Sequence, residues 1–334
     1  MNLPRTPGAL CDEILSIAIG DDVCIGEIVS PVVLECGPER PVHEAAALMS
    51  ERRVSSVIVV EGGEAVGIWT ERDALAVDMS DPAAFTRPLR EVMSAPLRTV
   101  PASFRLHELT VRFREEHVRH YLVVDDDGRR MGVVSQSDVV LNQGIEHYLK
   151  LRKVDSLVKG GLHAMPAAAR LPEATARMRE SGADAIVVDF GLEAEASPSG
   201  RYGILTERDI TRLVAQRVAC GEVGDFASRP LIACTEHDSL YRVRALLAER
   251  HIRHVGVIGA DGELCDLISF KDILSGMELA YVHELQHALH ERDAALHTSR
   301  RNLYLAEKVI ENSLEGVMVT DADVRIVSVN PAFT

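Results

Sequence analysis

Two stretches of this chain read almost alike, GIWTERD at residues 67–73 and GILTERD at residues 203–209. Two weaker copies, GVVSQSD at 132–138 and DLISFKD at 266–272, share the same outline. Successive copies end in an Asp, and these aspartates are 65, 71 and 63 residues apart, so most of the chain is a fourfold repeat. Each copy also places a Thr or Ser three residues before its Asp, which gives the pairs Thr70 and Asp73, Ser135 and Asp138, Thr206 and Asp209, and Ser269 and Asp272.

The residues before each copy repeat as well. In the second unit Leu106, Leu109 and Phe113 recur at helical spacing, and a strand-like YLVV, the turn DDDG and a second strand-like run follow. The third unit adds GLEAEASPSG, a polar stretch that predicts a surface loop. The pattern predicts an α/β (α+β) fold with a helix, strand, turn, strand and helix in each unit. The apolar helix positions of the other units are Val42, Ala45, Ala46 and Met49; Leu171, Ala174 and Met178; and Leu240, Val243 and Leu247.

A second pattern groups the units in pairs. TERD occurs only in the first and third units, whereas HVRH at 117–120 and HIRH at 251–254 occur only in the second and fourth. This alternation indicates the duplication of a two-unit module and predicts two such modules in tandem, joined near residues 145–155. The sequence leaves open whether the two modules pack within one subunit or pair across subunits.

The repeated T-x-x-D pattern allows two interpretations. It is a helix capping box, in which the hydroxyl accepts a hydrogen bond from a free backbone amide and the acid bonds back. It is also suited to a binding site, because helix N-termini favour anions and a carboxylate accepts hydrogen bonds from vicinal hydroxyls. Basic residues near these positions, among them Arg72, Arg208 and Lys271, suit phosphate recognition.

The repeated unit resembles the CBS domain, named for cystathionine beta-synthase, and each pair resembles a Bateman module. The resemblance covers residues 26–277 and implies a three-stranded sheet with two packed helices per unit and pseudo-twofold pairs. It also implies clefts that often bind adenine nucleotides, so AMP, ADP, ATP or another adenosyl compound is the expected ligand. The expected domains are an N-terminal segment, 1–25; a first pair, 26–145, with units 26–80 and 88–145; and a second pair, 150–277, with units 150–215 and 222–277.

The resemblance also implies which residues hold the nucleotide. In the family the Asp of the motif grips the ribose, the preceding Thr or Ser assists, and basic doublets contact phosphate. We therefore expect the first pair's Thr and Asp to act with the doublet of its partner unit, and likewise in the second pair. Two departures weaken the site on the fourth unit: Asp266 replaces a Gly, and Gly182 to Asp184 stand where a basic doublet could lie. The expected nucleotide-binding residues are Thr70, Arg72, Asp73, Arg119, His120, Ser135, Asp138, Thr206, Arg208, Asp209, Arg253, His254, Ser269 and Asp272.

A long helix is expected at residues 278–313. Val282, Leu289, Leu296, Leu303 and Ile310 recur every seven residues, which is a coiled-coil pattern, although the alternate seam positions include polar residues. A helix packed on the modules is the alternative to a rod between paired subunits. The same stretch contains HELQH at 283–287, which matches the H-E-x-x-H zinc protease signature. The heptad register turns these histidines away from the seam, with no third ligand, so we expect no metal site.

Near the end of the chain the apolar runs VMVT at 317–320 and RIVSVN at 325–330 are separated by the turn DADV and followed by NPAF at 330–333. Residues 314–334 resemble the start of a PAS domain, entered from a helix as in sensory kinases and cyclic-di-GMP enzymes. A complete domain needs about 100 residues. We therefore expect the chain to be part of a longer protein whose output is a GGDEF or EAL cyclic-di-GMP domain, with a histidine kinase as the alternative.

Composition limits the classes of partner. The net charge of −15 disfavours long-range attraction to nucleic acid or anionic membrane. No uncharged apolar run approaches the roughly 20 residues that cross a bilayer. Six scattered cysteines without a C-x-x-C pair or a secretory leader predict a reducing cytoplasm.

The sequence supports a regulatory, non-enzymatic segment, because it contains no constellation of nucleophile, base and oxyanion donors. We expect a homodimer that senses adenine nucleotides and relays their binding through the helix to a PAS domain and an output domain. A ligand-free scaffold for dimerisation is the alternative, and a HELQH metalloprotease is a remote third. The sequence does not determine the nucleotide, the number of occupied sites or the sign of regulation.

Overall fold

The computed structural model describes residues 23–116, 118–142, 146–191 and 198–333. The chain divides into two compact units, residues 1–276, called the core unit here, and residues 277–334, called the C-terminal unit. Most of the N-terminal segment expected at 1–25, His117 and part of the loop expected in the third unit lie outside the described residues.

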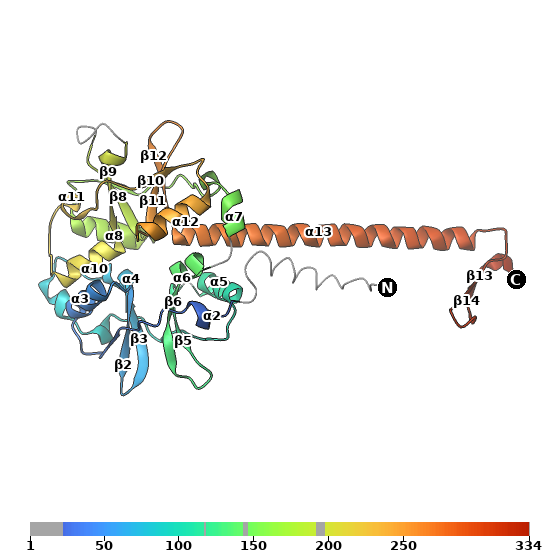
Figure 1. Cartoon of the computed structure of the whole chain (residues 1–334), viewed down its shortest axis with the longest axis horizontal. Helices are drawn as coiled ribbons and strands as arrows, with labels where there is room; N and C mark the ends of the chain where they lie inside the picture. Colours follow the sequence, from blue (N-terminus) through green and yellow to red (C-terminus); the bar gives the residue numbers. More distant parts are fainter. Residues whose placement is uncertain (1–22, 117, 143–145, 192–197, 334) are drawn as a thin grey trace. The chain divides into compact units, whose positions relative to one another are not determined.

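The described part of the core unit contains four sheets of three strands each, whose hairpins can be followed in Figure 1. In each sheet the first strand pairs parallel with the second, and the second pairs antiparallel with the third. The predicted hairpin of each unit is therefore present, with one short parallel strand added. The strands are β1 Glu35–Cys36, β2 Ser56–Glu61 and β3 Glu64–Thr70; β4 Thr99–Pro101, β5 His120–Val124 and β6 Arg130–Ser135; β7 Ala164–Pro166, β8 Ala185–Asp189 and β9 Tyr202–Thr206; and β10 Ala233–Thr235, β11 His254–Ile258 and β12 Leu264–Ser269.

Helices flank each hairpin as the apolar spacing predicts, and the helix positions named from the sequence are buried. The helix after each hairpin begins directly behind the Thr or Ser of the repeated motif. The helices are α2 Ile25–Ile28, α3 Val42–Arg52, α4 Glu71–Ala74, α5 Leu106–Glu115, α6 Gln136–Asn142, α7 Glu146–Leu151, α8 Leu171–Ser181, α9 Pro198–Arg201, α10 Glu207–Ala215, α11 Val223–Phe226, α12 Leu240–Glu249 and α13 Phe270–Glu311, with short 3-10 turns η1 Pro82–Thr86, η2 Leu89–Glu91 and η3 Val154–Ser156. The predicted mixed α/β fold is confirmed.

The sheets of neighbouring units pack in pairs. Ile58 and Ile68 of the first sheet form an apolar cluster with Leu122 of the second. Val187 and Tyr202 of the third sheet form another with residues of the fourth. Burial of apolar surface is the main favourable term in folding, so these clusters hold each two-unit module together. We call the modules module 1 (units one and two) and module 2 (units three and four).

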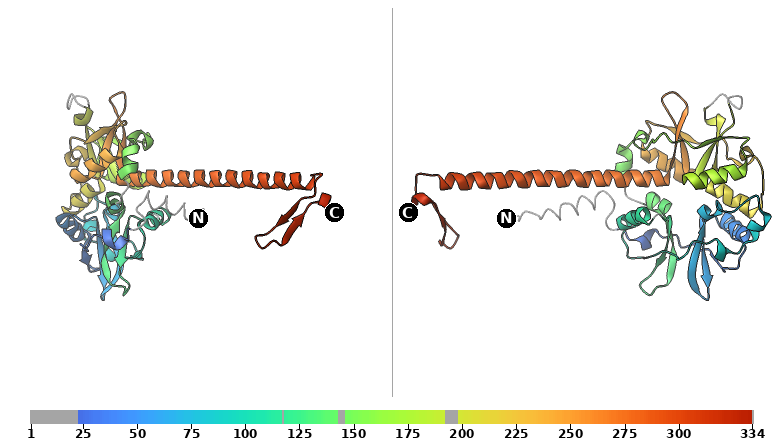
Figure 2. Two further views of the ribbon diagram at one scale, coloured as in Figure 1. Left: turned by 45° about the vertical axis from the view of Figure 1, so that its right-hand side comes forward. Right: turned by 180° about the vertical axis from the view of Figure 1, so that it is seen from behind.

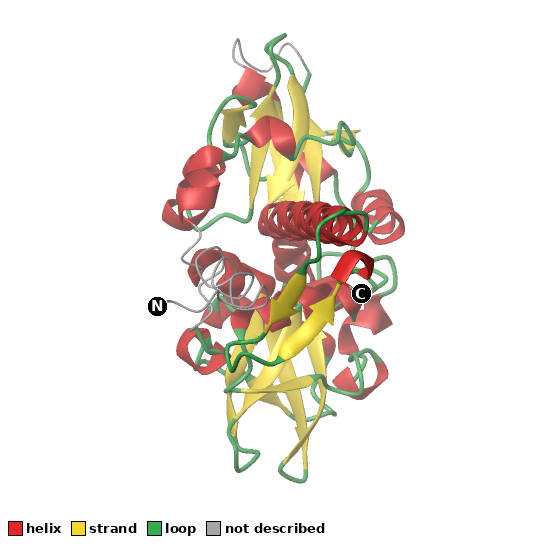
Figure 3. Cartoon of the chain, turned by 90° about the vertical axis from the view of Figure 1, so that its right-hand side faces the viewer, coloured by secondary structure: helices red, strands yellow, loops and turns green. Residues whose placement is uncertain are grey.

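The two modules of one chain also share a core. A continuous apolar cluster includes Met49 and Trp69 of module 1 and Met178, Leu205 and Ile210 of module 2. Helix α3 packs against α10 at this junction. In Figures 1, 2 and 3 the hairpins of module 1 lie at one end of the core unit, those of module 2 at the other, and helices between them. The structure thus shows the two modules packed against each other within one chain, a question that the sequence left open.

Segments that connect the units pack on the glycines of the first three repeated motifs, Gly67, Gly132 and Gly203. A Cβ on Gly67 would lie 2.6 Å from Met93 Sδ, and one on Gly132 would lie 2.2 Å from the Ser30 carbonyl oxygen. In the fourth unit Asp266 replaces this Gly, and its Oδ2 accepts hydrogen bonds from the backbone amides of Lys159 (2.6 Å) and Gly160 (3.2 Å). The departure noted in the sequence therefore has a structural role, because the carboxylate binds the connecting segment.

We expect Asp266→Ala to destabilise the core unit by about 1–3 kcal/mol, because two backbone amides lose their acceptor. The free energy of unfolding, measured by urea titration, checks this. Asp127→Ala is the matched control, since the Asp127 side chain makes an exposed ion pair with Arg129 and its loss should change stability by less than about 0.5 kcal/mol. Equal stability of the two variants would contradict the role given to Asp266.

The C-terminal unit begins inside helix α13 and includes its residues 277–311. A hairpin of strands β13 Met318–Thr320 and β14 Ile326–Val329 follows, and then the turn η4 Pro331–Phe333. The predicted long helix is present. Leu296 and Leu303 of the heptad pattern are 51% and 68% exposed, so the described part of the seam is unburied within one chain. No helix in the described part of the chain has the length and apolar character to cross a membrane.

Buried Asn330 joins the hairpin to the end of the helix. Its side-chain amide donates to the carbonyl oxygens of Ile310 (3.0 Å) and Glu315 (2.9 Å), and its Oδ1 accepts from the amide of Val317 (2.7 Å). These bonds satisfy backbone groups where the helix ends, so Asn330 fixes the hairpin to the helix.

We expect Asn330→Ala to release this hairpin, because removal of a buried hydrogen-bond partner costs about 1–3 kcal/mol. Hydrogen exchange of the amides in residues 317–329 should become faster. The control is Asn312→Ala, which removes one exposed bond to the Lys308 carbonyl oxygen at the helix end. Unchanged hairpin protection in Asn330→Ala would show that another contact holds the hairpin.

Candidate functional site

The four repeated motifs form the same local structure. The hydroxyl of Thr70 donates to Asp73 Oδ2 at 2.7 Å, and the backbone amide of Thr70 donates to the same oxygen at 2.8 Å. The distances are alike in Ser135 and Asp138, Thr206 and Asp209, and Ser269 and Asp272. In the first, second and third motifs the hydroxyl also accepts from the backbone amide of the Asp, at 3.3–3.4 Å, which completes a capping box. The capping interpretation is confirmed for these three motifs.

The motif aspartates are already engaged within the protein. Ser94 Oγ donates to Asp73 Oδ1 at 3.1 Å, and Arg212 contacts Asp209 Oδ1 at 3.0 Å. Burial raises the pKa of Asp73 above its ordinary value, against the opposing hydrogen bonds from Thr70. A ligand that bound these carboxylates would have to share them with these partners.

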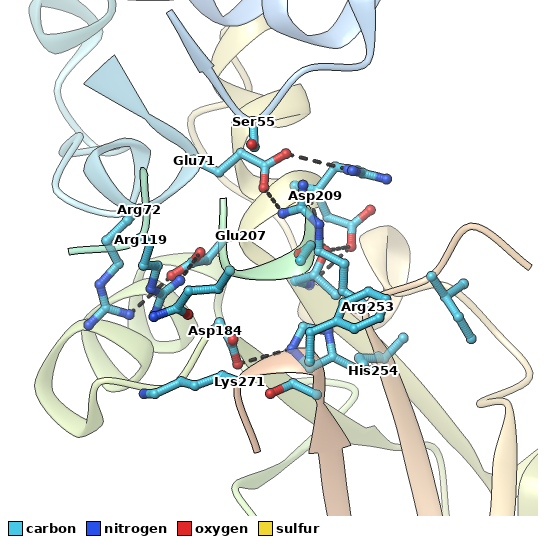
Figure 4. Close-up of a pocket in the computed structure, with 18 of the residues that line it drawn as sticks. Ser55, Glu71, Arg72, Arg119, Asp184, Glu207, Asp209, Arg253, His254 and Lys271 are labelled. Atoms are coloured by element: carbon cyan, nitrogen blue, oxygen red, sulfur yellow. Dashed lines mark hydrogen bonds and ion pairs between the residues drawn. The ribbon is translucent and has the colours of Figure 1, made fainter. Parts of the chain in front are cut away.

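A pocket of about 250 Å³, called the central pocket here, lies where the four units meet (Figure 4). Its lining includes the position just before the central strand of each unit: Ser55, Arg119, Asp184 and Arg253. Of the expected nucleotide-binding residues, the structure brings Thr70, Arg72, Arg119, His120, Ser135, Thr206, Arg208, Asp209, Arg253, His254 and Ser269 to this pocket; Asp73, Asp138 and Asp272 are not part of the lining. The basic residues predicted from both modules thus converge on one place.

Arginines from each module bind a buried glutamate of the other. Glu207 of module 2 accepts from Arg72 (3.1 Å) and Arg119 (2.8 Å) of module 1. Glu71 of module 1 contacts Arg208 (3.4 Å) and Arg253 of module 2. The two glutamate side chains are only 5% and 6% exposed, so these are charge-assisted contacts with limited access to water.

This arrangement differs from the grouping expected from the sequence. Arg119 was expected to act with Thr70 and Asp73 of its own module, but its guanidinium contacts Glu207 across the module boundary. Arg253 likewise contacts Glu71 instead of the motif of its own module. The reason is geometric, since the modules pack with these positions facing each other. All of these residues nevertheless line one pocket.

Sequence reasoning missed Glu71, Glu207, Ser55 and Asp184. The identical Glu in both TERD copies was a usable signal, because a capping box needs only the Thr and the Asp. A second signal was that the position of Ser55 in the first unit is Asp184 in the third, while the second and fourth units have Arg there. Their contacts could not be predicted, because each depends on a residue of another unit.

Two histidines contact the residues at these positions. His120 Nε2 lies 2.9 Å from Ser55 Oγ, and His254 Nε2 lies 3.0 Å from Asp184 Oδ1. Burial, together with the positive charges of Arg253 and Arg119, lowers the pKa of His120 to about 3, so its ring is neutral at physiological pH. Although burial opposes ionisation of Asp184, His254 and Arg119 hold its pKa below the ordinary value.

The lining therefore mixes cations with a smaller number of acids. Burial raises the pKa of Glu207, and the nearby arginines oppose this shift. Arg72, Arg119, Arg208, Arg253 and Lys271 outnumber the acids Glu71, Asp184, Glu207 and Asp209 in the lining. Within the described residues, no group of three or more His, Cys, Asp or Glu side chains is arranged to hold a metal ion. The side chains of HELQH at 283–287 lie outside the described part.

The CBS domain family matches residues 25–80, 89–143 and 223–278, which is half of the chain. The chain belongs to the CBS-domain family. The third unit is not among the matched ranges, but its β7–β8–β9 sheet has the same strand order and orientation as the other CBS units. CBS domains are regulatory modules that commonly bind adenosyl ligands.

Several known proteins are similar to the CBS region of this chain. An uncharacterized protein of Methanopyrus kandleri, MK0525, is 30% identical over 38% of this chain and 64% of its own length. Inosine-5'-monophosphate dehydrogenase of Aquifex aeolicus is 29% identical over 49% of this chain and 32% of its own length. The chain thus spans about one third of the dehydrogenase and under two thirds of the first protein. These similarities do not transfer an enzymatic activity.

Solved structures show the same fold. Protein MJ1225 of Methanocaldococcus jannaschii superposes with a TM-score of 0.64 and 18% identity, covering 76% of this chain and 99% of the archaeal protein. A conserved protein from Pyrococcus horikoshii superposes with a TM-score of 0.51, also at 18% identity and over 76% of this chain. At this identity the likeness concerns the arrangement of the elements alone.

Proposed function

We propose that the core unit is a regulatory sensor that binds an adenine nucleotide in the central pocket. The convergence of Arg72, Arg119, Arg208 and Arg253 on one pocket supports this most directly. Guanidinium groups match the geometry of phosphate oxygens and remain charged at physiological pH. In a chain with a net charge of −15, such a cluster of cations suits a local anionic ligand.

The pocket volume favours a compact anionic group. Pockets for drug-sized ligands span about 300–1,000 Å³, whereas this pocket has about 250 Å³. It would accept a phosphate and part of the ribose, with the base directed outwards between the units. The hydroxyls of Ser55, Thr70 and Thr206 in the lining add hydrogen-bonding groups for such a ligand.

We further propose that the ligand state is passed through helix α13 to a PAS domain and an output domain. The helix begins directly after Ser269 of the fourth motif, so a change in the fourth unit acts on its first turn. The exposed heptad positions Leu296 and Leu303 support pairing with a second copy as a coiled coil. Cyclic-di-GMP chemistry by GGDEF or EAL domains is our proposal for the output.

Calorimetric titration of the full chain with AMP, ADP, ATP and S-adenosylmethionine tests the sensing proposal. At least one of these ligands should release or absorb heat, and Arg253→Gln should weaken its binding by about tenfold, the effect of losing one charge-assisted contact. Arg253 is a better choice than Asp73 or Asp209, because those residues cap helices.

The control variant is Arg87→Gln, which removes an exposed pair with Glu91; neither residue is part of the pocket lining. It should bind the ligand as the unchanged protein does. Absence of heat with all four ligands would refute the sensor and favour a scaffold role. The contacts of Glu71 and Glu207 with arginines of the opposite module support that alternative, since they join the modules without a ligand.

A further inference from the structure

The central pocket has two related sides, because modules 1 and 2 are copies. Ser55 precedes strand β2 and Asp184 precedes strand β8, and each carbonyl oxygen accepts from the amide of the TERD glutamate, at 3.0 Å in module 1 and 3.1 Å in module 2. By this register, Glu71 corresponds to Glu207. The Ser55 side also contains His120, Arg208 and Arg253; the Asp184 side contains their counterparts His254, Arg72 and Arg119.

The two sides differ in charge at the position just before the central strand, which is Ser55 on one side and Asp184 on the other. Ser55 is a neutral hydroxyl that contacts His120, whose ring is also neutral, beside the guanidinium of Arg253. A phosphate oxygen placed there would meet a hydroxyl, a ring nitrogen and a cation. The carboxylates near this side are Glu71, which Arg208 and Arg253 already bind, and Asp209, which accepts hydrogen bonds from Thr206 and Arg212. The charges on this side of the pocket are therefore compatible with a bound anion.

On the other side the protein supplies its own anion. The Asp184 carboxylate lies 3.0 Å from His254 Nε2, and Arg119 acts on it electrostatically. A phosphate at this place would face a carboxylate at short range in a partly buried site, where repulsion is weakly screened. Figure 4 shows Asp184 turned towards His254 inside the pocket.

A second difference does not cancel the first. Lys271 lines the pocket where the corresponding residue of the second unit is Ser137. Its side chain is exposed and makes no ion pair with any residue in the described ranges, so solvent screens its charge. The local carboxylate of Asp184 therefore decides whether an anion is tolerated on that side.

We infer that the pocket binds the phosphate of one nucleotide at its Ser55 side, and that Asp184 closes the equivalent place on the opposite side. This rests on the proposed nucleotide binding and adds to it the stoichiometry and the residue that sets it. One chain then takes one phosphate group in this pocket, in spite of the duplication of the modules.

The test exchanges the two residues. Calorimetry with AMP should give one site per unchanged chain. Ser55→Asp should weaken AMP binding roughly tenfold or more, the usual size of a like-charge contact in a binding site. Asp184→Ser should add a second site, and the double variant with Ser55→Asp and Asp184→Ser should return to one site.

Ser55→Asn is the matched control, because Asn has the size of Asp without the charge. Its affinity for AMP should be within about threefold of that of the unchanged chain. This difference in binding free energy is smaller than the contribution of one hydrogen bond to a charged group. Equal loss of binding in Ser55→Asn and Ser55→Asp would assign the effect to volume and overturn the inference. Thermal unfolding of each variant confirms that it is folded before titration.

The outcomes separate the two proposals. AMP binding at two equal sites, or binding that neither Ser55→Asp nor Asp184→Ser changes, overturns the inference and leaves nucleotide sensing intact. A lack of heat with AMP and the other nucleotides, in both the unchanged chain and Asp184→Ser, overturns the sensor itself. A gain of one site in Asp184→Ser supports both.

Discussion

Arg119→Met is expected to destabilise the core unit by about 3 kcal/mol at pH 8. Arg119 is one of the two arginines that pair with the buried carboxylate of Glu207, and its removal leaves Arg72 alone to balance that charge. Glu207 is 6% exposed, and burial raises its pKa even with Arg72 and Arg119 both in contact. Arg119 also helps to keep Asp184 ionised. The loss of this arginine therefore affects two acids at the boundary between the modules.

The expected cost depends on pH. A carboxyl group whose pKa is higher in the folded than in the unfolded chain binds protons more tightly when folded, so lowering the pH stabilises the folded state. The pKa of Glu207 is raised already, and removal of Arg119 should raise it further. The cost of Arg119→Met should shrink as the pH falls from 8 towards 5, because the pH then approaches the ordinary glutamate pKa of about 4.3.

Urea unfolding at several pH values measures this effect, and two further variants define its cause. The double variant with Arg119→Met and Glu207→Gln should recover most of the lost stability, because no uncompensated glutamate remains. Arg87→Met, which removes an exposed pair with Glu91, should change stability by less than about 0.5 kcal/mol at any of these pH values. A pH-independent cost without rescue would mean that Arg119 stabilises by packing alone.

Gly132→Ala should destabilise the core unit by about 3 kcal/mol, the upper end of the usual cost of overpacking. An added Cβ would lie 2.2 Å from the Ser30 carbonyl oxygen and 2.5 Å from Val29 Cγ2. Ser30 and Val133 exchange two backbone hydrogen bonds, at 3.1 and 3.2 Å, so the connecting segment cannot withdraw without losing them.

Gly37→Ala is the control for this substitution. A Cβ on Gly37 meets no atom within 4 Å, and the loss of backbone freedom in the unfolded chain should leave stability unchanged or raised by up to about 1 kcal/mol. The two free energies of unfolding, compared in one urea series, check the prediction. A cost below about 1 kcal/mol for Gly132→Ala would show that the segment at Ser30 shifts readily.

Much of the fold could be predicted from the sequence because its signals are local. Apolar residues such as Leu106, Leu109 and Phe113 at helical spacing are buried in one helix. Turn residues between apolar runs predicted the hairpin of each unit. The T-x-x-D pattern predicted the helix starts, since the hydroxyl and the carboxylate bond within four residues of each other.

The candidate site could be predicted only in part. The sequence identified most of the residues that line the pocket, because the duplicated motifs and the basic doublets stand out. It did not identify the partner of each arginine. Arg119 and Glu207 are 88 residues apart, and their contact exists only because module 1 faces module 2.

By itself, then, the sequence determined the fourfold repeat, its grouping in pairs, the helices and hairpins, and the helix caps, because each depends on residues close together in one unit. The tertiary structure alone decided that TERD glutamates bind arginines of the opposite module and that Ser55 and Asp184 occupy corresponding places in one pocket. The physical reason is that periodicity specifies local conformation and buried faces, whereas charge pairing across modules depends on how those faces dock.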